Sequence, residues 1–155
     1  MRISYLKDRP ELGAQLIPGL LDHWRYVFPE DTAEARLARL RTHLNHDVLP
    51  IAWIAHEDDV ALGMAALRIT DLEGREDLGP WLASVYTEPR FRGRGIASQL
   101  CRIVERKAAD LGIAKLYLFT HGQESLYRRL GWAHLEPTTW HGHACSIMQK
   151  VPSAA

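Results

Sequence analysis

The chain has 155 residues, of which 46% are hydrophobic and 25% charged, a composition typical of a folded globular protein and unlike that of a disordered one. Its 19 Lys and Arg residues balance its 19 Asp and Glu residues, and this zero net charge argues against a dedicated nucleic-acid binder. The length is that of one ordinary domain, so we expect a single domain over residues 1–155.

Cysteine content and hydropathy indicate the compartment. Cys101 and Cys145 are too few for a disulfide framework or a zinc ribbon, and no histidine pair is joined by a converging set of further ligands, so we expect no metal. The opening residues MRISYLKDRPELG contain no apolar run resembling the core of a signal peptide. The longest nearly apolar run, from Val60 to Leu67, is too short to cross a membrane. We therefore expect a cytoplasmic protein with reduced thiols and no membrane contact.

Hydrophobic periodicity predicts a strand, two helices and a hairpin in the first half of the chain. Residues 3–5 favour a short strand, and helical spacing of apolar residues continues over 12–27. We expect Pro18-Gly19 to kink or break that helix, because proline lacks the N–H that a helix interior needs. A second helix over 32–44 is capped by Asp31 or Thr32. Two strand-like runs, 49–58 and 60–70, predict a hairpin.

The second half of the chain alternates strands and helices. A third run at 80–89 leads into the strongest helix pattern of the chain, over 92–112, which Gly112 is placed to end. A compact strand at 115–120, a short helix within 124–132 and two closing strands complete the pattern. The resulting order, β-α-α-β-β-β-α-β-α-β-β, predicts an α/β fold with a central mixed β-sheet flanked by helices on both faces.

The most informative segment is SVYTEPRFRGRGIASQ, residues 84–99, where a strand enters a Gly- and Arg-rich turn that opens directly onto a helix. Gly93 and Gly95 allow a ligand to approach the backbone closely, and the first N–H groups of the helix have no internal partners. Together with the positive end of the helix dipole, these groups form an anion site, to which Arg90, Arg92 and Arg94 add charge. A phosphorylated ligand is the natural occupant.

Two common phosphate motifs do not fit this turn. A dinucleotide fingerprint needs an acidic residue on the next strand, and KLYLFT has none. A P-loop needs Gly-Lys-Ser/Thr at the start of the helix, and the chain has none there. From the residues alone, a solvated basic turn with glycines for geometry remains an alternative.

Two motifs resemble those of a known family. VYTEPRFRGRGIASQL resembles the central motif of the GNAT superfamily of N-acetyltransferases, Arg/Gln-x-x-Gly-x-Gly/Ala, which here reads Arg92-Gly93-Arg94-Gly95-Ile96-Ala97. ESLYRRLGW resembles the second signature of the family, a tyrosine followed closely by Leu-Gly-Phe/Trp. The predicted order of elements fits the family over essentially the whole chain. The resemblance implies a GNAT-like acyl-CoA N-acyltransferase fold with acetyl-CoA, or a related acyl-CoA, as co-substrate.

The resemblance also implies roles for individual residues. The backbone of Val85, Tyr86 and Thr87 is expected to pair with the pantetheine arm, and Thr120 replaces an asparagine that contacts the cofactor in many members. Tyr127 is the expected catalytic acid, because an unperturbed tyrosine is protonated at neutral pH and can donate to a departing thiolate. The turn and helix start that would hold the pyrophosphate comprise Arg92, Gly93, Arg94, Gly95, Ile96, Ala97 and Ser98.

The chain also departs from the family. Several members carry a glutamate base on the strand before the pyrophosphate loop, but residues 80–83 (Pro-Trp-Leu-Ala) include no acid. The base is left open between an acceptor that arrives neutral and a water held by Glu73, Glu76 or Asp77. The family places its acceptor pocket near Trp24, Tyr26 and Phe28, which hydrophobicity alone assigns to the core.

The leading interpretation is an enzyme that transfers the acetyl group of acetyl-CoA directly to a primary amine of a small molecule or peptide. A non-catalytic acyl-CoA-binding sensor or regulatory module is the alternative, favoured by the missing glutamate and disfavoured by Tyr127. A nucleotide or RNA binder is disfavoured by the zero net charge. We expect no nucleic-acid partner, and a homodimer is left open.

Overall fold

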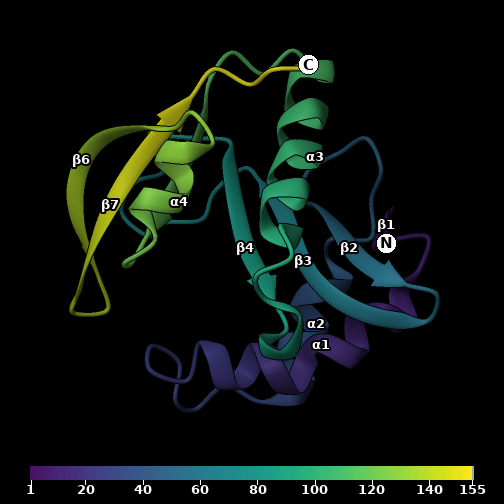
Figure 1. Cartoon of the computed structure of the whole chain (residues 1–155). Helices are drawn as coiled ribbons and strands as arrows, with labels where there is room; N and C mark the ends of the chain where they lie inside the picture. Colours follow the sequence, from purple (N-terminus) through teal and green to yellow (C-terminus); the bar gives the residue numbers. More distant parts are fainter. Residues whose placement is uncertain (155) are drawn as a thin grey trace.

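The structure, a computed structural model, describes residues 1–154 and is built around one seven-stranded sheet (Figure 1). The strand order in the sheet is β1-β2-β3-β4-β5-β7-β6, and β4 and β5 are its parallel pair. The strands are β1 (Arg2–Tyr5), β2 (Ile51–Glu57), β3 (Val60–Arg68), β4 (Trp81–Thr87), β5 (Leu116–Thr120), β6 (Ala133–Trp140) and β7 (His143–Lys150). The helices are α1 (Pro10–His23), α2 (Ala33–Arg41), η1 (Pro89–Phe91), α3 (Ile96–Asp110) and α4 (Glu124–Arg129). The predicted order of strands and α-helices is confirmed.

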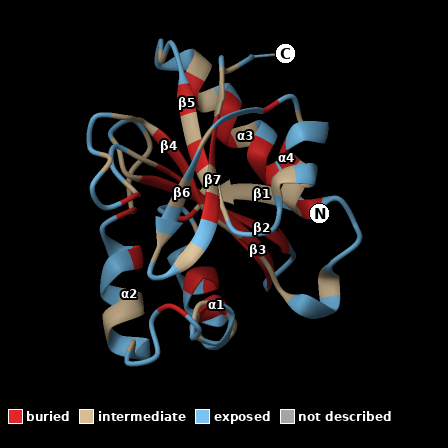
Figure 2. Ribbon diagram, turned by 90° about the vertical axis from the view of Figure 1, so that its left-hand side faces the viewer, coloured by how far each residue is buried: buried red, intermediate tan, exposed pale blue. Residues whose placement is uncertain are grey.

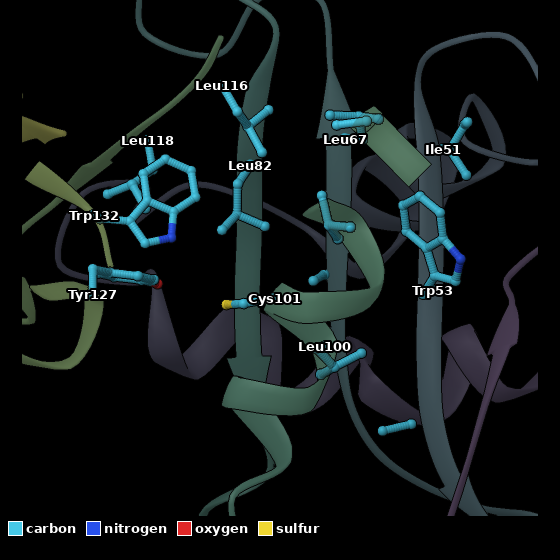
Figure 3. Close-up of a cluster of buried hydrophobic side chains, with 14 of the residues drawn as sticks. Ile51, Trp53, Leu67, Leu82, Leu100, Cys101, Leu116, Leu118, Tyr127 and Trp132 are labelled. Carbon is cyan, nitrogen blue, oxygen red and sulfur yellow. The ribbon is translucent and has the colours of Figure 1, made fainter. Parts of the chain in front are cut away.

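Helices cover both faces of the sheet, as the sequence predicts. On one face, α3 and α4 pack Leu100, Val104 and Tyr127 against strand residues such as Leu82 and Leu118 (Figure 3). On the other face, α1 and α2 pack against a different set of strand residues, including Ile54 and Met64. Buried residues therefore run along the central strands, between two helical layers (Figure 2).

Helix α1 continues through Pro18, so the predicted break at Pro18-Gly19 is wrong. Burial explains the difference, because Leu12, Leu16 and Leu20 of this helix are almost completely buried against the sheet. Each buried leucine contributes roughly 1.5–3 kcal/mol, which together exceeds the cost of a proline in a helix, about 3 kcal/mol. Gly19 is required for the same packing, since a β-carbon there would overlap the Tyr86 hydroxyl.

The parallel strands β4 and β5 diverge soon after they meet, and this divergence positions the site. Their register holds one pair, Trp81 with Tyr117. On its other edge β4 contains a bulge, because Tyr86 pairs with Met64 whereas Ala83 pairs with Ala66. Ser84 lies in this bulge with a φ of 52°. Such bulges bend a strand, and here the C-terminal end of β4 separates from the β6–β7 hairpin (Figure 1).

Candidate active site

A cavity of about 1090 Å³ opens where β4 and β5 diverge. Its walls include residues 82–85 of β4, residues 118–120 of β5, and Tyr127 of α4. On the opposite face of the sheet, the walls come from the α1–α2 segment, from α2, and from residues 70–76 of the β3–β4 loop. The cavity therefore connects the face covered by α3 and α4 with the face covered by α1 and α2. We call these two parts the cofactor half and the acceptor half.

The cofactor half is bounded by a strand edge with unused hydrogen-bonding groups. The Glu88 N–H donates to the Leu62 carbonyl on β3 at 2.8 Å. Backbone groups alternate in direction along a strand, so Tyr86 also faces β3, while Val85 and Thr87 face the opposite edge. The Thr87 hydroxyl is buried and has no hydrogen-bond partner within residues 1–154. This edge fits a ligand with amide groups, such as pantetheine.

The turn before α3 has the geometry of an anion site. Gly93 and Gly95 have φ values of 82° and 76°, a region that favours glycine, and no described atom lies within 4 Å of a β-carbon built at either position. The Gln99 N–H bonds to the Gly95 carbonyl at 3.1 Å, which leaves the N–H groups of residues 96–98 at the open end of the helix. Ile96 buries its side chain, so its backbone alone can serve a ligand.

The arginines of the turn differ in their contacts. Arg92 donates from Nε to the Thr87 carbonyl at 3.3 Å, which ties the turn to the free edge of β4. Arg94 is half-exposed, packs over the Phe91 ring, and lies 3.8 Å from Glu57. Both arginines belong to the glycine turn that leads into α3.

Tyr127 and Thr120 both line the cavity, Tyr127 from α4 and Thr120 from the end of β5. Tyr127 is almost completely buried, and its hydroxyl points toward the sulfur of Cys101 (Figure 3). Burial, and to a smaller extent the Cys101 thiol, raise the pKa of Tyr127. The hydroxyl therefore stays protonated throughout the neutral range.

The acceptor half is rich in charge. Asp31 is paired with Arg36 at 2.9 Å and also with Arg39, and its side chain is almost completely buried. Five carboxylates and three arginines line the whole cavity, which gives it a net charge of about −2 with neutral histidines: Glu30, Asp31, Asp71, Glu73 and Glu76, with Arg36, Arg39 and Arg68. An excess of negative charge favours a cationic ligand.

The aromatic residues between the first two helices line this half; Trp24 also packs against the core beneath α1, as hydrophobicity suggested, whereas Tyr26 and Phe28 are not core residues. Tyr26 and Phe28 are 47% and 37% exposed. The Tyr26 ring lies 4.9 Å from the ring of His143, and the Phe28 ring lies 5.8 Å from that of Trp140. These contacts join the α1–α2 segment to the β6–β7 hairpin and close one side of the cavity.

The three carboxylates suggested as water-holding groups divide between cavity and surface. Glu73 and Glu76 line the cavity, whereas Asp77 is ion-paired with Arg75 and is not among the lining residues. Sequence reasoning missed Asp71, which lines the acceptor half. The available signal was its position, since an acid directly after the strand-like run 60–70 lies where a strand ends in a loop.

Within residues 1–154, no three His, Cys, Asp or Glu side chains converge as metal ligands. In the same range, no helix is long and apolar enough to span a membrane.

Comparison with known proteins identifies the family. The model of the acetyltransferase (GNAT) family matches residues 15–132. An aminoglycoside N(6')-acetyltransferase type 1 of Salmonella typhimurium is 29% identical over 136 residues, which cover 81% of this chain and 93% of the relative. The corresponding protein of Salmonella enteritidis matches to the same extent.

Solved structures agree on the fold. An aminoglycoside 6'-N-acetyltransferase complexed with coenzyme A superposes with a TM-score of 0.76 at 21% identity, covering 99% of this chain and 98% of the other. An aminoglycoside 6'-N-acetyltransferase from Enterococcus faecium gives 0.75 at 20% identity with the same coverage. With the family model matching most of its length, this chain belongs to the GNAT acetyltransferase family and is an N-acetyltransferase that uses acetyl-CoA as its co-substrate.

Proposed function

We propose that the protein transfers the acetyl group of acetyl-CoA directly to a primary amine of a small molecule or peptide, and that a small cationic molecule is the acceptor class. The observation that carries the proposal is the cavity, which opens on both faces of the sheet and so offers two substrates a common meeting point. The negative charge of the cavity and the two relatives named aminoglycoside N(6')-acetyltransferases support a cationic acceptor. An aminoglycoside with a 6'-amine is therefore the first acceptor to test.

The residues of the cofactor half fit acetyl-CoA. The free edge of β4 offers the backbone groups of Val85 and the N–H of Thr87 to pantetheine amides, and the Thr87 hydroxyl, which has no partner within residues 1–154, adds a further polar group. The open glycine turn and the N–H groups of residues 96–98 suit a pyrophosphate. When bound, acetyl-CoA supplies an acetyl group activated as a thioester.

The chain's own residues then orient the amine and protonate the departing sulfur. Groups of the acceptor half hold the amine, whose nitrogen forms a bond to the acetyl carbon while the carbon–sulfur bond breaks. Tyr127 donates its phenolic proton to the departing sulfur and recovers a proton lost by the acceptor nitrogen, so that one further proton leaves to solvent for each ammonium consumed. No acyl-enzyme is needed, and both cysteines are buried.

Thiol release tests the proposal. Purified protein is incubated with acetyl-CoA and a panel of amines that includes an aminoglycoside with a 6'-amine and one with a 6'-hydroxyl at the same position. We expect release with the 6'-amine compound and an acetylated product one acetyl group heavier by mass spectrometry. If no amine in the panel accelerates thiol release above the background hydrolysis, the proposed function is wrong.

A further inference from the structure

The acceptor half contains a largely buried carboxylate, Asp71, that no part of the acetyl-transfer scheme above uses. Its side chain is 16% exposed, and it lines the cavity just beyond the end of β3. One oxygen, Oδ1, accepts a hydrogen bond from Nη1 of Arg68 at 3.0 Å. This is the one hydrogen bond of the Asp71 side chain within residues 1–154, and because Asp71 lines the cavity, its second oxygen is open to a ligand there.

Arg68 is itself fixed by a buried histidine. Its Nε donates to Nε2 of His43 at 2.8 Å, so Nε2 is unprotonated and Nδ1 carries the ring hydrogen. That Nδ1–H donates to the Arg39 carbonyl at 2.9 Å, at the C-terminal end of α2. A chain of hydrogen bonds therefore runs from the backbone of α2 through His43 and Arg68 to the Asp71 carboxylate.

The histidine in this chain of bonds does not change its charge near neutral pH. His43 is 4% exposed, and burial, followed by the neighbouring Arg68 charge, lowers the pKa of His43 to about 4. The histidine thus remains a neutral acceptor for Arg68 and keeps the arginine in place. The direction of the Asp71 carboxylate is set by groups that neither titrate nor rotate freely under assay conditions.

Stability alone is a weak reason for this arrangement. A buried ion pair loses the hydration of both charges, and well-packed apolar residues often stabilise a protein as much or more. At this position the pair presents an oriented carboxylate oxygen to a cavity whose other two arginines, Arg36 and Arg39, both lie against Asp31. An ammonium group is the complementary ligand, because charge-assisted hydrogen bonds to a fixed carboxylate are about twice as strong as neutral ones.

We propose that Asp71 binds an ammonium group of the acceptor, with Arg68 and His43 as positioning residues that hold its carboxylate toward the cavity. The inference rests on the proposed function, since it assigns the amine of that reaction to the acceptor half. The proposal names Asp71 and not Glu73, although both acids of the β3–β4 loop line the cavity. Arg68 holds Asp71 in place, whereas Glu73 is not paired with a cation in residues 1–154.

Asp71→Asn is the central variant, because the amide keeps an oxygen for Arg68 and removes the charge. We expect the KM of a 6'-amino aminoglycoside to rise about tenfold or more, as for a lost hydrogen bond between charged groups, with kcat within about twofold and the KM of acetyl-CoA unchanged. Asp71→Glu restores the charge and should recover part of the affinity. Asp59→Asn is the control, since it also removes a carboxylate paired with an arginine, Arg9, but lies on the exposed β2–β3 hairpin outside the cavity.

Direct binding separates this inference from the proposed function. The same aminoglycoside is titrated calorimetrically into wild-type and Asp71→Asn protein, each saturated with coenzyme A, so that the result does not depend on turnover. Turnover with an unchanged KM and Kd in Asp71→Asn overturns the role of Asp71 and leaves the proposed function intact. Binding that depends on Asp71, without turnover of any amine in the panel, supports the role and overturns the function. If wild-type protein neither binds nor acetylates any amine in the panel, both are wrong.

Discussion

The buried His43 makes folding stability depend on pH in a way that can be worked out. The ordinary pKa of histidine is about 6.5, and in the folded protein the pKa of His43 is about 4. As the pH falls below 6.5, His43 becomes protonated in the unfolded chain, whereas in the folded protein it stays neutral until the pH approaches 4. This contribution to the free energy of unfolding is therefore complete above pH 6.5 and is lost as the pH falls through that window. The loss is about 2 kcal/mol at pH 5 and about 3 kcal/mol at pH 4.

Urea unfolding at pH 7.5 and at pH 5 measures this loss, and His43→Gln isolates it. Glutamine offers an oxygen to the Arg68 Nε and does not titrate, so the variant should lose about 2 kcal/mol less than wild type between the two pH values. His141→Gln, which removes an exposed histidine from the β6–β7 turn, should behave as wild type. An equal pH dependence in wild type and His43→Gln would refute the reasoning, because it would mean that His43 titrates alike in the folded and unfolded chain.

Three further predictions concern the reaction and the cofactor. Tyr127→Phe keeps the ring and its packing, so we expect the single-turnover rate to fall about 100-fold with the Kd of acetyl-CoA unchanged, and an unchanged rate would reduce Tyr127 to a packing residue. Gly95→Asp should abolish acetyl-CoA binding in calorimetry, whereas Gly95→Asn, which tolerates the same left-handed backbone without the charge, should retain part of it; equal affinities would exclude repulsion at a phosphate site. Acetyl-CoA at 100 times its Kd should stabilise the fold by about 2.7 kcal/mol, visible as a rise in Tm that ATP at the same concentration does not produce; equal shifts would contradict the cofactor fit.

Periodicity predicted the fold because most elements carry their signal locally. Helix α2 begins after Thr32, whose hydroxyl accepts from the Ala35 N–H at 3.1 Å, one of the two caps that the sequence proposed. The glycine turn was predictable for the same reason, since a positive φ at Gly93 and Gly95 and the start of α3 depend on neighbouring residues only. The predicted break at Pro18 was wrong because the burial of a leucine stripe against the sheet outweighs the local cost of a proline in the helix.

The acceptor half could not be predicted in the same way. His43, Arg68 and Asp71 lie on α2's C-terminal side, at the end of β3 and in the following loop, so their hydrogen bonds exist only once α2 packs beside the sheet. Tyr26 and Phe28 look like core residues in the sequence, and only their contacts with the β6–β7 hairpin identify them as a cavity wall. Residues distant in sequence carry no periodic signal that links them. The glycine turn could therefore be predicted from the sequence, whereas the acceptor half could not.

The missing glutamate of β4 bears on the choice between an enzyme and a sensor. A module that only binds acyl-CoA needs the free edge of β4 and the glycine turn, which together form the cofactor half. This chain also builds an acceptor half, with buried charges at Asp31 and Asp71 whose desolvation costs several kcal/mol per ion unless partners offset it. The β3–β4 loop, and not β4 itself, supplies acids to that half. The absence of an acid at residues 80–83 therefore removes one position for a base, but carboxylates still line the cavity. A module that only binds acyl-CoA has no need of this second, charged half of the cavity, so its presence favours the enzyme over the sensor.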